Sequence, residues 1–297
     1  MKHIWLFLKG LAMGAADVVP GVSGGTIAFI TGIYTELLDS IKSINLNALK
    51  ILFRDGVPAF WKAINGTFLL TLLSGILIAL ITLARGIHYL LLNHPIWVWS
   101  FFFGLIVASC WHIGKEIPRW RWQELAALAA GAIIAAWISV ASPTQIEATP
   151  MIVFLAGSVA ICAMILPGIS GSFILLLMGL YEPILGAVKA LDLGIMGLFA
   201  VGAGLGLMLF SRLLSWLLHH YQSVMFALLT GFMAGSLVKV WPWKETLLTR
   251  INSKGVEVPF IQSNILPDSA TTAVLALLLA GAGLGLVLLL EKVAKDD

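Results

Sequence analysis

Charged residues are scarce in this chain of 297 residues: only 11% are Asp, Glu, Lys or Arg, whereas 60% are hydrophobic. So little charge excludes a soluble globular protein as well as a disordered one. The formal net charge of +3 is too small and too scattered to predict a nucleic-acid partner. Cysteine is also rare, and Cys110 and Cys162 both lie in apolar runs. We therefore expect two packing thiols rather than a disulfide or a metal site.

Long apolar runs are what the chain has instead. Several exceed the roughly 18 residues that suggest a membrane span. The chain is therefore predicted to be an all-α, multi-pass membrane protein, and its longest polar segment, 241–270, is predicted to be a loop. The expected spans are 67–84, 95–113, 124–141, 195–211, 222–240 and 271–290.

Two further apolar stretches are interrupted by the motif Pro-Gly-x-Ser-Gly, at residues 20–24 and again at 167–171. Proline followed by closely spaced glycines cannot continue a helix. In hydrocarbon, a broken helix is tolerated only where its freed backbone groups are buried in protein or face a polar cavity. We expect helices over 3–19 and 24–40 around the first break, and a second broken element over 151–190. The sequence leaves open whether each break makes a re-entrant hairpin or a kinked span.

The two breaks belong to an internal repeat. Pro167 follows Pro20 by 147 positions, and the same offset relates Tyr181 to Tyr34. After an insert at 42–66 the offset falls to 127, as an insertion in the first half requires. At this second offset the matched pairs are Gly75 with Gly202, Arg85 with Arg212, Gly104 with Gly231, and Ser109 with Ser236.

We therefore divide the chain into a first repeat, 1–145, which carries the insert, and a second repeat, 146–297. If each half holds one broken helical hairpin and about three spans, the number of crossings per half is odd. The halves then point in opposite directions across the bilayer. Such inverted repeats are typical of secondary transporters, which bind their substrates near the midplane at discontinuous helices.

The insert at 42–66 alternates basic with apolar residues. This pattern predicts an amphipathic helix in the membrane interface, and the alternative is a solvated loop helix. Most basic loop residues fall on the same side as the insert, and because basic loops face the cytoplasm, both termini are expected there. The exceptions on the other side are Lys189, Lys244, Arg250 and Lys254.

The breaks themselves have the chemistry of an anion site. A helix that begins at Ser23 or Ser170 has unpaired N–H groups and the positive end of its dipole at the break. Two such ends with nearby hydroxyl groups would bind an anion, above all phosphate. The alternative is that the motif only kinks the chain and allows close packing. The expected phosphate-binding residues are Gly21, Ser23, Gly24, Gly25, Thr26, Gly168, Ser170, Gly171 and Ser172.

Five charged residues are candidates for ion coupling or charge pairing. Asp17 lies three positions before the first break, and its repeat equivalent is Met164. An acidic residue inside an apolar run is costly without a function or a partner. Asp17 could carry a proton, pair with an arginine, or cap local backbone. The other candidates are Glu36 and Glu182, together with Arg85 and Arg212, which could hold lipid phosphates or snorkel to headgroups.

Other motifs give less information about function. The glycine triplets within 202–206 and 281–285 resemble dinucleotide motifs but lie inside spans, so we interpret them as helix-packing positions. The pairs His88/His94 and His219/His220 have no carboxylate or cysteine at ligand spacing, so we expect neither a metal nor a cofactor.

Besides a transporter that binds the phosphate of a lipid at the two breaks, two other functions remain open. Residues 21–25 fit G-x-S-x-G, the motif of an intramembrane serine hydrolase. That motif requires a strand-to-helix turn, and no histidine has an evident place as the base, so we expect no enzyme. A secondary transporter of a small soluble anion is the closer alternative. A closed aqueous vestibule would favour it, whereas a lateral opening between helices would favour a lipid.

Residues 10–40 and 160–190 resemble the PopT-type polyprenyl-phosphate transporters of bacteria and archaea, formerly a domain of unknown function. The shared runs are Gly-Ala-Ala-Asp-Val-Val-Pro-Gly-Val-Ser-Gly-Gly-Thr and Leu-Pro-Gly-Ile-Ser-Gly-Ser. The resemblance implies that the protein moves undecaprenyl phosphate, the lipid carrier of cell-wall synthesis, from the outer to the inner leaflet of the bacterial cytoplasmic (inner) membrane. It also implies that the motif residues, with Asp17 and Pro20 among them, lie where phosphate binds.

Moving such a charged substrate across the membrane has an electrical cost. A phosphate monoester carries roughly −1.5 to −2 charges at neutral pH. Moving two negative charges inward against an inside-negative potential of 100 mV costs about 4.6 kcal/mol, at ~2.3 kcal/mol per charge. We therefore expect coupling to protons or to another cation. The sequence leaves the oligomeric state open.

Overall fold

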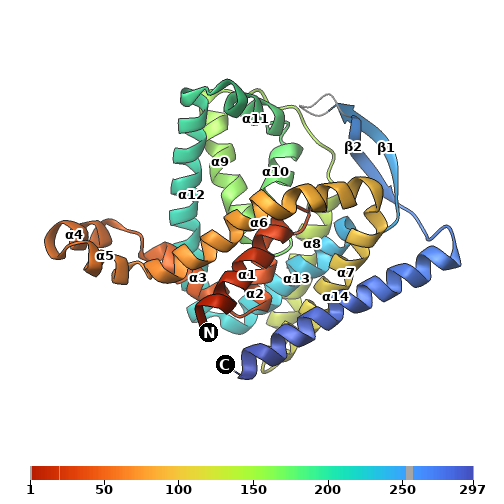
Figure 1. Ribbon diagram of the computed structural model, residues 1–297, viewed down its shortest axis with the longest axis horizontal. Coiled ribbons are helices and arrows are strands. Elements are labelled where there is room, and N and C mark those ends of the chain that lie inside the picture. Colours follow the sequence, from red (N-terminus) through yellow and green to blue (C-terminus); the bar gives the residue numbers. More distant parts are fainter. Residues whose placement is uncertain (1, 20, 252–256, 297) are drawn as a thin grey trace.

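The computed structural model describes residues 2–19, 21–251 and 257–296 and is a bundle of helices with one β-hairpin (Figure 1). Pro20 and Lys254 therefore lie outside the described residues. Six described helices are long and apolar enough to cross a membrane, three in each predicted half. They are α6 (Gly66–Asn93), α7 (Pro95–Glu116), α8 (Trp122–Val140), α12 (Leu193–His220), α13 (Gln222–Val240) and α14 (Ala270–Asp296). The six predicted spans are thereby confirmed.

The first broken element has three pieces: α1 (Lys2–Asp17), α2 (Gly24–Ile30) and α3 (Tyr34–Ser43). The prediction of one helix over 24–40 is wrong, because a turn separates α2 from α3. Gly32 in this turn has φ +72°, which a helix cannot accommodate.

The second broken element repeats this arrangement with α9 (Pro150–Ile165), α10 (Gly171–Leu177) and α11 (Tyr181–Ala190). Gly179, in the turn between α10 and α11, has φ +73°, and the two helices are bent by 109°. The end of α10 returns to the segment that leads into α9, since the Thr144 N–H donates to the carbonyl of Leu177 (2.7 Å). The α9–α10 pair is therefore a helical hairpin rather than one kinked helix.

The all-α prediction missed one feature, an antiparallel β-hairpin in the expected loop 241–270. Strands β1 (Lys244–Ile251) and β2 (Glu257–Asn264) pair with each other, with Lys244 opposite Asn264. Both segments contain Thr, Ile or Val, which favour strands, among polar residues that favour a loop. The β-hairpin lies at the end of the molecule opposite the two termini, and we call these the β-hairpin end and the terminus end (Figure 1).

The insert forms two short helices, α4 (Leu46–Asp55) and α5 (Val57–Ala63), which project from the bundle (Figure 1). Both expose apolar side chains, with Leu46 76% and Phe53 82% exposed. The predicted amphipathic character is present, and contact with the membrane surface stays a prediction.

Glycines bring the long helices into close contact, and they do so at matched positions in the two halves. A methyl group at Gly75 of α6 would overlap the carbonyl oxygen of Phe7 in α1. Likewise, one at Gly202 of α12 would overlap that of Phe154 in α9. Gly75 and Gly202 are 127 positions apart, and Phe7 and Phe154 are 147 apart, which are the two offsets of the sequence repeat. The local structure is therefore repeated along with the sequence.

The glycine triplet of α14 confirms the packing interpretation for one of its three members. A methyl group at Gly283 would overlap the carbonyl oxygen of Phe101 in α7, whereas Gly281 and Gly285 face open space. These contacts surround a core centred on α2, α7 and α13, in which Ala28, Ile106 and Met233 are fully buried.

Candidate functional site

The two breaks, far apart in sequence, touch each other inside the bundle. The Ser23 hydroxyl donates a hydrogen bond to the carbonyl of Met164 (2.8 Å), and the Gly168 N–H donates to the Thr26 hydroxyl (2.9 Å). Ser23, Thr26 and Ser170 are all buried, at 1%, 0% and 7% exposure. We call this contact, formed by residues 21–26 and 164–172, the junction.

Equivalent glycines shape both sides of the junction. Gly21 has φ +85° and Gly168 has φ +82°, a conformation that residues with a side chain rarely adopt. Each is also closely packed: an added Cβ would lie 2.6 Å from Cγ of Lys239 at Gly21, and 2.7 Å from the carbonyl oxygen of Phe232 at Gly168. The motif therefore does serve close packing, as the alternative interpretation expected.

At the first break, the donors at the start of α2 are already engaged. The Gly24 N–H donates to the Asp17 carboxylate (2.7 Å), and the Gly25 N–H donates to the Ser23 hydroxyl (3.1 Å). Of the three roles considered for Asp17, the structure shows the cap on local backbone. An anionic group of the protein thus occupies the position that was predicted for a bound anion.

The second break differs because Met164 replaces the carboxylate. Ser170 precedes α10, but its side chain makes no capping hydrogen bond to that helix. Its hydroxyl lies instead 2.9 Å from the hydroxyl of Ser172, which is exposed. All nine predicted phosphate-binding residues lie at the junction, and the hydroxyl groups without a backbone partner among the described residues are those of Ser170 and Ser172.

The other charged candidates lie elsewhere. Glu36, in the first turn of α3, accepts a hydrogen bond from Asn65 (3.0 Å). Glu182 lies in the first turn of α11. Arg85 and Arg212 are exposed on α6 and α12, and among the described residues neither forms an ion pair with Asp17.

Lys239, in the last turn of α13, is a junction neighbour that the sequence analysis missed. Its aliphatic stem packs on Gly21, and its ammonium lies 4.4 Å from the ring centroid of Phe173 in α10. It therefore contacts both breaks. The repeat offset of 127 relates it to His112 of α7, and this match of two basic residues was the signal available in the sequence.

A pocket of about 290 Å³ lies between the α2–α3 turn, the last turns of α7 and the first turns of α13. Thr31, Thr35, His112 and Glu116 form its polar lining. His112 and Glu116 are paired across 3.6 Å.

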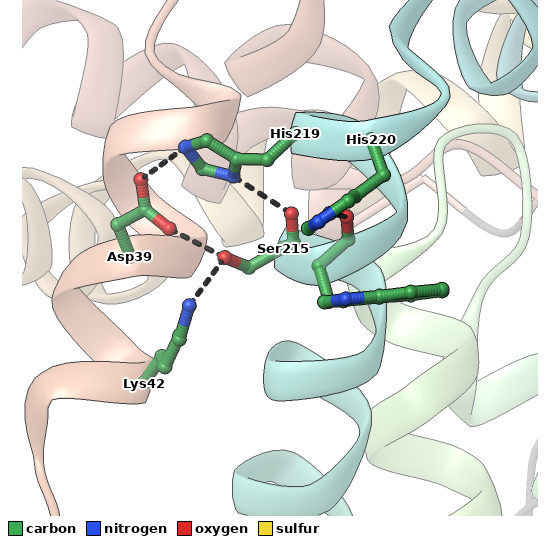
Figure 2. A network of polar contacts seen from close by, with 6 residues as sticks. Asp39, Lys42, Ser215, His219 and His220 are labelled. Atoms are coloured by element: carbon green, nitrogen blue, oxygen red, sulfur yellow. Dashed lines mark hydrogen bonds and ion pairs between the residues drawn. The ribbon is translucent and has the colours of Figure 1, made fainter.

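A polar network ties the first half to the second between α3 and α12 (Figure 2). The Ser215 hydroxyl donates to Asp39 (2.6 Å) and accepts from the Lys42 ammonium (3.2 Å). Nε2 of His219 lies 3.6 Å from the same Asp39 carboxylate, while its Nδ1 lies 2.8 Å from the backbone carbonyl of Ser215.

These contacts bear on the hydrolase alternative. A serine nucleophile needs its hydroxyl hydrogen-bonded to a base. The Ser23 hydroxyl donates to a backbone carbonyl, and the Ser215 hydroxyl donates to Asp39 rather than to His219. Neither serine has the geometry of a nucleophile in the part of the chain that is described.

The comparisons with known proteins agree with the sequence resemblance. Residues 13–258 match a family model described as undecaprenyl phosphate translocase-like. The chain is 52% identical over 302 aligned residues to a protein of Vibrio cholerae named polyprenyl-phosphate transporter, covering 99% of this chain and 98% of that protein. It is 36% identical to a Staphylococcus aureus protein of the same name, covering 82% and 88%. No solved structure matches this chain.

Proposed function

Because this chain belongs to the undecaprenyl phosphate translocase-like family, we propose that it moves polyprenyl phosphate from the outer to the inner leaflet of the bacterial cytoplasmic membrane. The lipid carrier of cell-wall synthesis would thereby be returned for reuse. The observation that carries this proposal is the junction, where two helix breaks meet inside the bundle.

The chemistry of the substrate explains why such a junction is useful. The phosphate headgroup carries roughly −1.5 to −2 charges and cannot cross hydrocarbon bare. The isoprenoid tail is at home in lipid and needs no shelter. Ser170 and Ser172 supply hydroxyl donors at the second break, while the glycines and Ser23 of the first break form the wall against which the headgroup rests.

Inverted repeats over 1–145 and 146–297 provide the alternating access that this movement requires. The matched glycine contacts and the equal φ angles of the two breaks support the duplication. The opposite orientation is supported by Figure 1, in which α3 lies near the termini and its equivalent, α11, lies toward the other end of the bundle.

The terminus end is assigned to the cytoplasm, because α3, which leads into the basic insert, lies near the termini (Figure 1) and basic segments face inward. The headgroup would then enter at the β-hairpin end and leave at the terminus end, where the pocket beside His112 opens. Coupling to protons or another cation offsets the electrical cost of about 4.6 kcal/mol for two charges at 100 mV, and Asp17 is the candidate carrier.

Purified protein in proteoliposomes tests this function. A short-chain polyprenyl phosphate is placed in both leaflets, and phosphatase is added outside. Without transport about half of the lipid phosphate stays protected, whereas with the protein nearly all of it is released. Vesicles without protein are the control for leakage. Protection of half the lipid in the presence of protein, or uptake of inorganic phosphate in its place, would contradict lipid transport and the latter would favour the soluble-anion alternative.

A further inference from the structure

Two lysines at the C-terminal end of α13 lie among aromatic rings rather than in solvent. The ammonium of Lys244, the first residue of β1, lies 3.6 Å from the ring centroid of Trp99 in α7. That of Lys239 lies 4.4 Å from the ring centroid of Phe173. Both rings are buried, so each cation rests on an aromatic face.

Neither lysine has a negatively charged partner among the described residues. Lys244 donates one hydrogen bond to the backbone carbonyl of Lys239 (2.6 Å), which brings the two side chains to one place. No carboxylate of the described residues forms an ion pair with either lysine, and the adjacent Glu245 is exposed. An ammonium carries three donors, and partly buried cations without a counter-charge are costly.

Two other unsatisfied donors lie next in sequence to Trp99 and to Lys244. Within the described part of the chain, the buried side-chain polar atoms without a hydrogen-bond partner are the Ser100 hydroxyl and the Trp243 indole nitrogen. Ser100 follows Trp99, and Trp243 precedes Lys244. Buried donors are nearly always paired in proteins, so each of these calls for an acceptor. Two buried donors without an acceptor thus lie, in sequence, next to the residues of α7 and β1 that form the contact between Trp99 and Lys244.

This place is continuous with the junction. The stem of Lys239 packs on Gly21 of the first break, and its ammonium lies over Phe173, the residue that follows Ser172 at the second break. An acceptor bound to Lys239 therefore lies next to both breaks, on the side of the junction that faces the β-hairpin end.

We propose that Lys239 and Lys244 form a binding site for a phosphate monoester at the β-hairpin end of the junction. A phosphate with about two negative charges matches two lysines in charge, and its three oxygens match their spare donors. This inference rests on the proposed function and deepens it, because it names the side chains that receive the headgroup. The same chemistry would hold a free phosphate ion, so the test separates the two sources.

The test measures binding to the full-length protein in detergent, with a short-chain polyprenyl phosphate and with inorganic phosphate as separate probes. Lys239→Met and Lys244→Met remove the charges and keep the aliphatic length. Each is expected to weaken lipid-phosphate binding at least about tenfold. The matched control is Lys115→Met, because Lys115 also lies over an aromatic ring, at 4.9 Å from that of Trp111, but is exposed at the other end of α7. The control is expected to bind as wild type does.

Thermal unfolding distinguishes a binding role from a structural one. Without ligand, the Met variants are expected to be at least as stable as wild type, since they remove unpaired cations. The upward shift of the midpoint on adding lipid phosphate is expected to be lost, and Lys239→Arg is expected to recover part of it.

The possible outcomes separate the site from the function. Met variants that bind lipid phosphate as tightly as wild type would overturn the lysine site and leave lipid transport standing. A wild-type protein that binds neither probe would overturn the proposed function and the site with it. Binding of both probes that is lost in the Met variants supports the site and shows that phosphate alone suffices. Binding of the lipid alone, lost in the same variants, supports the site and requires the tail.

Discussion

The hydroxyl of Ser23 donates a hydrogen bond to the backbone carbonyl of Met164 across 141 positions of sequence. This contact joins the N-cap of α2 to the last turn of α9 and, with the hydrogen bond from the Gly168 N–H to the Thr26 hydroxyl, holds the two breaks against each other. Because the same hydroxyl also accepts from Gly25, Ser23 is fully committed to structure. The hydroxyl of its repeat equivalent, Ser170, makes no capping hydrogen bond and lies beside the hydroxyl of Ser172. The two serines are therefore expected to differ in role.

Ser23→Ala and Ser170→Ala should separate stability from binding. Loss of the Ser23 cap is expected to destabilise the protein by about 1 kcal/mol, measured as a lower unfolding midpoint in detergent. Ser170→Ala is expected to leave the midpoint nearly unchanged and to weaken lipid-phosphate binding about fivefold, the value of one hydrogen bond. Equal effects of the two substitutions on both quantities would show that the breaks have the same role.

Asp17 can be tested by substitutions that separate its charge from its cap. Asp17→Asn keeps an oxygen acceptor for the Gly24 N–H, so folding is expected to survive, whereas Asp17→Ala is expected to lose about 1 kcal/mol of stability. If Asp17 carries the coupling cation, Asp17→Asn transport in proteoliposomes no longer responds to an imposed pH gradient or voltage. A wild-type response in Asp17→Asn would assign coupling to another group.

The lysine site should make binding depend on pH. Burial, with the neighbouring charge of Lys239 as a second cause, holds the pKa of Lys244 well below its usual range. Lys244 therefore loses its charge at a lower pH than an ordinary lysine. Above pH of about 7 the phosphate is already fully charged, so affinity is expected to fall as the pH rises through the lowered pKa of the lysine. Lys244→Arg should flatten the profile, because arginine stays protonated. A flat profile in the wild-type protein would argue against Lys244 as a ligand.

The glycine triplet of α14 offers a matched test of helix packing. Gly283→Ala would force a methyl group onto the carbonyl oxygen of Phe101, and a loss of about 1–3 kcal/mol is expected from overpacking. Gly281→Ala, two positions away on another face of the helix, meets open space and is expected to be neutral or slightly stabilising. Unfolding midpoints of the two variants in the same detergent check this, and similar midpoints would contradict the packing described.

The sequence predicted those features that depend on local composition. Long apolar runs located all six spans, and Pro-Gly motifs located both breaks, because each follows from residues adjacent in the chain. The turn at Gly32 was missed since one glycine among helix-forming neighbours does not by itself end a helix. The β-hairpin was missed because its pairing joins two short segments that resemble a polar loop when read separately.

Of the candidate site, the residues of the two breaks could be predicted from the sequence, whereas their neighbours in space could not. The break residues carry a visible motif, whereas Lys239 lies near the end of an apolar span, where a lysine is ordinarily interpreted as snorkelling to headgroups. Its contact with Gly21 depends on how α13 packs against the junction. The engagement of Gly24 by Asp17 likewise follows from the turn between α1 and α2, which the sequence does not specify.

The most direct measurement is the structure of this protein with a short-chain polyprenyl phosphate bound. We expect the phosphate at the junction, with its oxygens about 3 Å from the hydroxyls of Ser170 and Ser172 and the tail leaving between helices into lipid. A phosphate bound at the exposed Arg85 or Arg212, with the junction closed and unchanged, would contradict it.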